Sequence, residues 1–114
     1  MAELTVQDVS LVGLAPAYQA VADGDYFVPA SAGKYMIHVK NAHTSSWTVT
    51  INDPISVAPS GAKAFDPDVD VVVPNATERM ILIDVGRFKD PSTNRIDLAY
   101  TGLTALTIGV FRLP

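Results

Sequence analysis

Apolar and polar residues alternate with a period of two along most of the chain, which is the pattern of β-strands buried on one face. Short clusters of glycine, proline, asparagine and aspartate separate the alternating runs, and residues 18–22 have room for only one helical turn. The pattern predicts an all-β fold, either a β-sandwich or a small barrel. We expect a single small β-sandwich, jelly-roll-like, of about eight short antiparallel strands. The strands are expected at residues 4–9, 26–28, 34–40, 47–52, 69–73, 79–84, 96–101 and 106–111.

The stretch KYMIHVKNAHTSSWTVTIND, residues 34–53, contains two alternating runs around a small polar tip. It predicts a β-hairpin with one face on the core and a connecting loop of about half a dozen residues. The faces expected to be buried carry Tyr35, Ile37 and Val39 on the first strand and Trp47, Val49 and Ile51 on the second.

Three other segments lead to distinct expectations. Residues 79–84 are apolar at most positions, which predicts a central strand covered on both faces. Residues 53–67 are rich in turn residues, with at most one short strand at 55–57, and residues 86–93 read as a long polar turn.

Composition narrows the class of protein. The 114 residues suit one domain, spanning 1–114, and 48% hydrophobic residues are enough for a packed core. No cysteine is present, so disulfides and zinc–cysteine sites are excluded. The net charge of −4 and the scattered basic residues argue against a nucleic-acid partner. No signal-peptide pattern or membrane-length apolar run occurs, so we expect a soluble protein made in a cytoplasm, without a membrane partner.

Candidate chemistry is sparse. His38 and His43 are the only histidines, and they lack a third ligand at useful spacing for a metal. The run Asp66, Asp68 and Asp70 resembles the start of a calcium loop, but the glycine and glutamate that such a loop needs later are missing, so an acidic turn is favoured. No nucleophile motif or phosphate-binding loop occurs. We therefore expect no enzyme, no metal and no cofactor.

Trp47 leaves two interpretations open. Carbohydrate-binding modules use aromatic side chains as stacking platforms on a sheet. The register of Trp47 with Val49 and Ile51 instead favours a core position.

Several segments in a fixed order resemble a known group. They are MAELTVQDV at residues 1–9, GLAPAY at 13–18, MIHVKN at 36–41, WTVTI at 47–51, VPNATER at 73–79, RFKD at 87–90 and LAYTGLTALTI at 98–108. Together they resemble head-decoration or minor capsid proteins of tailed phages that infect actinobacteria. The resemblance covers nearly the whole chain, with departures at Asn75–Thr77 and in the proline-rich stretch between Asn52 and Asp68.

The resemblance implies a bacteriophage virion structural protein, a capsid decoration (cement) protein. Such a protein binds the major capsid protein on the exterior of the head and stabilises contacts between capsomers. A homotrimer at local three-fold positions is the first expectation, and a monomer at capsomer centres is the rival. The alternative function is a tail or neck accessory module that recognises a host-surface glycan.

Contact residues are expected in three places. The N-terminal segment 1–9, with Leu4, Val6 and Gln7, is a candidate docking strand that adds to a neighbour's sheet. The tip around His43, and the pair Arg87 and Phe88, are the others. The competing interpretations are an ordinary internal strand, a solvated loop and a buried turn plug, respectively.

Overall fold

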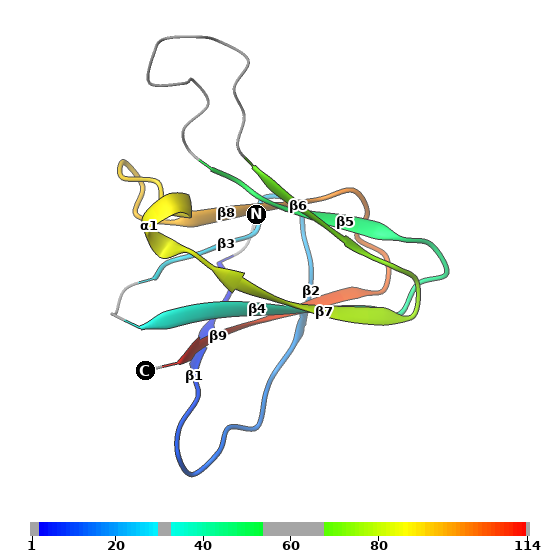
Figure 1. Cartoon of the computed structure of the whole chain (residues 1–114). Helices are drawn as coiled ribbons and strands as arrows, with labels where there is room; N and C mark the ends of the chain where they lie inside the picture. The colour runs from blue at the N-terminus through cyan, green and yellow to red at the C-terminus, as the bar shows by residue number, and fades with distance from the viewer. Residues whose placement is uncertain (1–2, 30–32, 54–67, 114) are drawn as a thin grey trace, which may run out of the picture.

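The computed structural model describes residues 3–29, 33–53 and 68–113. These residues form two β-sheets stacked face to face and one short helix (Figure 1). The strands are β1 (Val6–Asp8), β2 (Gln19–Ala20), β3 (Tyr26–Phe27), β4 (Lys34–Asn41), β5 (Trp47–Ile51), β6 (Val69–Val73), β7 (Thr77–Ile83), β8 (Ile96–Tyr100) and β9 (Leu106–Leu113), and the helix is α1 (Val85–Phe88).

The strand order confirms the predicted β-sandwich. One sheet has the order β1-β9-β4-β7, with β2 also paired to β9, and the other has the order β3-β8-β5-β6. With β2 taken as the strand beside β9, the eight strands β2 to β9 form sheets 2-9-4-7 and 3-8-5-6, which is the arrangement of a jelly roll.

The core lies between the two sheets. The strand β4 alternates strictly, so Tyr35, Ile37 and Val39 are buried while the residues between them are partly exposed. Ile108 and Val110 of β9 continue this buried layer, and a single cluster of buried apolar side chains joins both sheets. The inward faces predicted from the sequence for residues 35–39 and 47–51 are therefore correct.

The predicted hairpin of residues 34–53 is wrong. The strand β4 pairs with β7 and β9, whereas β5 pairs with β6 and β8, so the two strands lie in different sheets. The alternation determines which side chains face inward but not which strand is the neighbour. The connecting residues 42–46 pass from one sheet to the other.

Asn41 fixes that crossing. It is buried, and its side-chain amide donates to the carbonyl of Val73 at 3.0 Å and to that of Ser45 at 2.9 Å. Its side-chain oxygen accepts from the backbone N–H of His43 at 2.8 Å. The Asn41 amide therefore connects the end of β4 to β6 of the opposite sheet. It also provides hydrogen-bond partners for backbone groups of His43 and Ser45 in the connection that follows β4.

The prediction of a covered central strand at residues 79–84 is also wrong. The strand β7 is the edge of its sheet, and its side chains are exposed except for the half-buried Ile81 and the buried Ile83. Met80 is 64% exposed and Leu82 is 70% exposed. An apolar run covered on both faces is typical of a parallel sheet between helices. The only helix in the described residues is the four-residue α1, which is too short to cover the outer face of β7.

The opposite edge of the same sheet departs from the antiparallel expectation. The strand β1 pairs with β9 in parallel, with Val6 beside Val110, and β2 pairs antiparallel further along, with Gln19 beside Ile108. Two short segments therefore share one edge of β9. The connection between them, residues 9–18, extends beyond the body of the sandwich (blue in Figure 1).

The segment predicted as a polar turn after β7 begins with α1. The carbonyl of Asp84 accepts from the N–H groups of Arg87 and Phe88, and Phe88 fills a core position. Arg87 forms an ion pair with the buried Asp53, with 3.0 Å between Nε and Oδ2. The short strand considered at residues 55–57 lies outside the described residues.

The first prediction concerns the packing of Trp47 on Gly102. A Cβ added at Gly102 would overlap the indole ring of Trp47. We expect Gly102→Ala to lower the free energy of unfolding by about 1–3 kcal/mol, because overpacking forces the ring or the backbone to move. Urea denaturation measures this. Gly86→Ala is the control, since a Cβ there meets only Asp84 Oδ1 at 3.5 Å; an equal loss in both variants would contradict the explanation.

A buried carboxylate supports a second prediction. Asp25 is fully buried, and its Oδ2 accepts from the Tyr100 hydroxyl at 2.9 Å and from the N–H of Ala22 at 3.0 Å. Burial, the charge of Asp25 and this hydrogen bond raise the pKa of Tyr100 far above its ordinary value. The phenol therefore stays protonated in the folded protein.

We expect Tyr100→Phe to lower the free energy of unfolding by about 1.5–3 kcal/mol at neutral pH, because the buried carboxylate loses its phenol donor. Since the folded pKa lies above the unfolded one, the contribution is complete below about pH 10 and declines as pH rises further and the unfolded phenol ionises. The difference between wild type and variant, measured by urea denaturation from neutral to alkaline pH, should shrink at the alkaline end. A difference that stays constant would contradict the assignment.

Candidate functional site: an exposed apolar sheet face

The outer surface of β4 and β7 is the most unusual surface of the described chain. The outward side chains of β4 alternate with its buried ones and include Met36 and His38. Met36 lies beside Leu82, and His38 lies beside Met80, in the pairing of the two strands. We call these four residues the β4–β7 face. Three apolar side chains and one imidazole thus share a surface that no other strand of the described residues covers.

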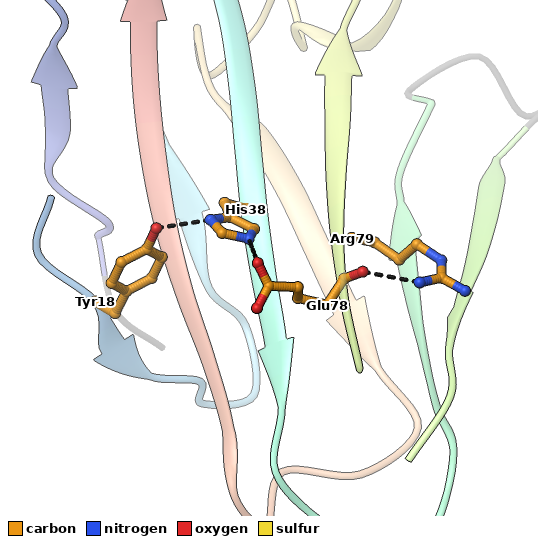
Figure 2. Close-up of polar contacts among 4 residues, drawn as sticks. All are labelled: Tyr18, His38, Glu78 and Arg79. Carbon is orange, nitrogen blue, oxygen red and sulfur yellow. Dashed lines mark hydrogen bonds and ion pairs between the residues drawn. The ribbon is translucent and has the colours of Figure 1, made fainter. Parts of the chain in front are cut away.

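A chain of hydrogen bonds crosses this face. The hydroxyl oxygen of Tyr18 lies 2.6 Å from Nδ1 of His38, and Nε2 of His38 lies 2.8 Å from Oε1 of Glu78 (Figure 2). The His38 side chain is only 12% exposed, whereas that of Glu78 is 60% exposed. The imidazole therefore links a residue of the 9–18 connection to a solvent-facing carboxylate on β7.

The chemistry of the partners assigns the proton positions. An ionised carboxylate only accepts, so Nε2 of His38 carries the hydrogen and donates to Glu78. In the neutral imidazole Nδ1 then accepts from the Tyr18 hydroxyl. Burial, and secondly the charge of Glu78, raise the pKa of Tyr18, which keeps its phenol a donor. The arrangement orients the three side chains, but a phenol held in its protonated form is not an activated nucleophile.

Tyr18 also anchors the 9–18 connection on the sheet. Its ring meets Phe111 edge-on at 6.0 Å between centroids, and the ammonium of Lys40 lies 3.9 Å from the centre of the ring. The Gln7 side chain of β1 forms two hydrogen bonds with the backbone of Ala17, next to Tyr18, each 2.8 Å long, and so joins the two ends of the connection. These contacts fix the end of the connection, at Ala17 and Tyr18, on the sheet, while its middle part is exposed.

A shallow groove of about 210 Å³ lies between this connection and β7. Its lining is mainly apolar, with His38 and Tyr18 as the polar members. The lining residues are Val9, Leu14, Pro16, Tyr18, Met36, His38, Met80 and Phe111. The groove continues the β4–β7 face, so the two form one apolar surface bounded by charged residues.

The N-terminal contact residues expected from the sequence have structural partners instead. Leu4 is buried in the core, and its N–H donates to the carbonyl of Tyr26 at 2.7 Å. Val6 is partly buried beside Val110, and the Gln7 amide is occupied by Ala17. The segment is thus paired within its own chain, which corresponds to the internal-strand interpretation.

The other three expected contact residues are also engaged. Phe88 is buried, so its side chain is not exposed to a partner, and Arg87 is held by Asp53. His43 stacks on Trp47 at 5.0 Å between centroids, and its Nδ1 accepts from the N–H of Ser45. None of the six expected residues contributes to the β4–β7 face.

The structure also places the candidates for metal and sugar binding. His38 and His43 do not share a site, and no cluster of three potential metal ligands occurs within residues 3–29, 33–53 and 68–113. Asp68 accepts from the N–H of Asp53, Asp70 is exposed and accepts from Thr50, and Asp66 lies outside the described residues. Trp47 is half-buried, and its indole N–H donates to the carbonyl of Thr104 at 3.0 Å.

The β4–β7 face had one signal in the sequence. The run Met80–Ile83 is apolar on both faces, which by itself predicts a strand covered on both faces. An edge strand that is covered by another molecule has the same pattern. Nothing in the local sequence separates the two, because the difference lies in which strands pair.

Comparison with known proteins does not identify the chain. No known protein family, no curated protein and no solved structure matches it. In the part of the chain that the structure describes, no helix is long and apolar enough to cross a membrane. A functional assignment therefore depends on the surface itself and on the sequence resemblance.

A third prediction tests the hydrogen-bond chain. At about pH 8, neutral His38 should be almost entirely in the tautomer protonated at Nε2, because Glu78 can only accept. Nitrogen chemical shifts of the imidazole measure this. Glu78→Gln, with an amide that also donates, should increase the other tautomer, and His43 serves as an internal comparison. Equal populations of the two tautomers at His38 in the wild type would contradict the geometry.

Proposed function

We propose that this chain is a virion structural protein, a decoration (cement) protein that docks through its β4–β7 face on the exterior of a phage capsid. The observation that supports it is the exposure of Met80 and Leu82 on the edge strand β7. The large exposed apolar side chains of the described residues also include Leu11, Val12 and Val72, and none of this set is aromatic. Exposed apolar patches of this kind mark protein contact sites.

The energetics suit a protein that binds in many copies. Covering the exposed two-thirds of two such side chains contributes about 2–4 kcal/mol, which alone corresponds to a dissociation constant in the millimolar range or weaker. A weak individual contact becomes effective when subunits act together on a lattice. A homotrimer at a local three-fold position would provide such a combination.

The fold is compatible with this role and with the glycan-binding alternative, because jelly rolls occur in both viral capsid and lectin domains. The exposed side chains favour the capsid-binding role over glycan binding. A sugar-stacking platform needs an exposed aromatic ring, and Trp47 is half-buried between His43 and the Gly102 turn. The exposed apolar side chains on β7, Met80 and Leu82, are instead flexible and not aromatic, as expected for a protein contact.

A fourth prediction tests the proposal in virions of the phage that encodes the chain. Quantitative peptide mass spectrometry against the major capsid protein should give hundreds of copies, near a simple ratio to the capsid lattice. A dozen copies or fewer would place the protein in the neck or tail and favour the glycan-binding module. Absence from virions would reject both.

The same virions test the surface. Leu82→Lys should reduce incorporation at least about tenfold, because a charge replaces the apolar contact. Leu103→Lys is the matched control, since Leu103 is also exposed and apolar but lies in the β8–β9 connection. Equal incorporation of both variants would show that the β4–β7 face is not the docking surface.

A further inference from the structure

The strand β7 lies at the end of its sheet and has a free edge. The strand has seven residues, without proline or glycine, and among the described residues it pairs only with β4, along one of its two edges. The other sheet edges of the described residues are shorter or interrupted. The strands β1 and β2 divide the edge of β9, and the edge strands of the second sheet, β3 and β6, have two and five residues. A long, apolar, unpaired edge is a template for another strand.

The hydrogen-bonding groups of this edge point outward. Arg79 Nη1 donates to the backbone carbonyl of Glu78 at 2.8 Å, and Figure 2 shows this contact on the side of β7 away from His38 and β4. A residue in an antiparallel strand directs its N–H and C=O to the same side. Glu78, Met80 and Leu82 therefore present their backbone groups at the free edge, with the guanidinium of Arg79 over the first of them.

The charged side chains beside the free edge of β7 indicate which residues a complementary strand would carry. On its paired side, β7 has Lys40 opposite Glu78, and continuing the register by one residue beyond the Tyr35–Ile83 pair places Lys34 opposite Asp84. The carboxylate of Glu78, whose Oε1 already accepts from His38, and the carboxylate of Asp84 are exposed and lie six positions apart, with Met80 and Leu82 between them. A strand on the free side meets the same row, so its complement has two basic residues flanking apolar ones.

We propose that β7 accepts an extended segment of the docking partner as an added antiparallel strand, with basic residues six positions apart and apolar residues between them on the same face. This deepens the proposed function, since it specifies how the β4–β7 face is covered. Main-chain hydrogen bonds supply the binding, and Met80, Leu82 and the two carboxylates select the segment. The Arg79 guanidinium occupies the carbonyl of Glu78 until the incoming segment displaces the guanidinium. This limits pairing of the free edge with unrelated strands.

The probe is a fluorescent, acetylated peptide with the sequence of β4, KYMIHVKN, because this sequence already complements β7 on its other side. Binding to the full-length protein is measured by fluorescence anisotropy. N-methylation at the positions equivalent to Met36 and His38 removes donors to the β7 edge and should weaken binding at least about tenfold. Replacing both lysines of the peptide by glutamate should weaken it similarly.

Protein variants locate the site. Leu82→Lys should weaken peptide binding at least about tenfold, Leu103→Lys should leave it unchanged, and Arg79→Ala should strengthen it by about threefold, since the edge loses its cover. No binding up to about 1 mM peptide, or equal binding of the N-methylated peptide, would overturn the strand-addition proposal. Sedimentation that shows a dimer dissociated by Leu82→Lys would also overturn it, because a second copy would then be the occupant. Hundreds of copies per virion without peptide binding would retain the decoration function and reject this mode of docking.

Discussion

The two sheets each have one apolar face, and the burial of these faces against each other is the constraint on which the structure depends. Tyr35, Ile37 and Val39 of the central strand β4 point toward the opposite sheet, where Val49 and Ile51 of β5 point back. Because β4 already has β7 and β9 as neighbours, the next strand can bury its apolar face only from the other sheet. The crossing at Asn41 and the jelly-roll order follow from this division.

The division into two sheets leaves edge strands, and the two edges of the sheet that contains β4 differ in how they are covered. At β9 the edge is filled by two short strands, which the Gln7 amide joins by imitating a backbone pairing with Ala17. At β7 the edge stays open, with Arg79 beside it and Met80 and Leu82 exposed. Among the described residues, β7 is the longest edge strand without a second neighbour, so a strand added there gains more main-chain hydrogen bonds than at the five-residue edge strand β6.

The hydrogen-bond chain from Tyr18 to Glu78 connects these features. It lets a polar histidine lie within an apolar surface without unsatisfied nitrogens, and it holds the 9–18 connection beside the groove. Three of the residues expected from the sequence to contact a partner have contacts within the sandwich, with Leu4 and Phe88 in the core and Arg87 paired with Asp53. Their chemistry was compatible with either role, because a terminal strand, an aromatic residue and an arginine serve equally in cores and at interfaces.

Alternation along the chain was sufficient to predict the all-β class, the position of Val69–Val73 as a strand and the inward faces of β4 and β5, because a period of two is a local property of a strand. It was not sufficient for the pairing of β4 with β7 and β9, the parallel contact of β1, or the exposure of Met80 and Leu82. These depend on which strands meet across long sequence separations, and that is decided by how two apolar faces and a limited number of edges are covered together. The fold class was thus determined by the sequence pattern, while the candidate docking surface exists only because the tertiary structure places β7 last in its sheet.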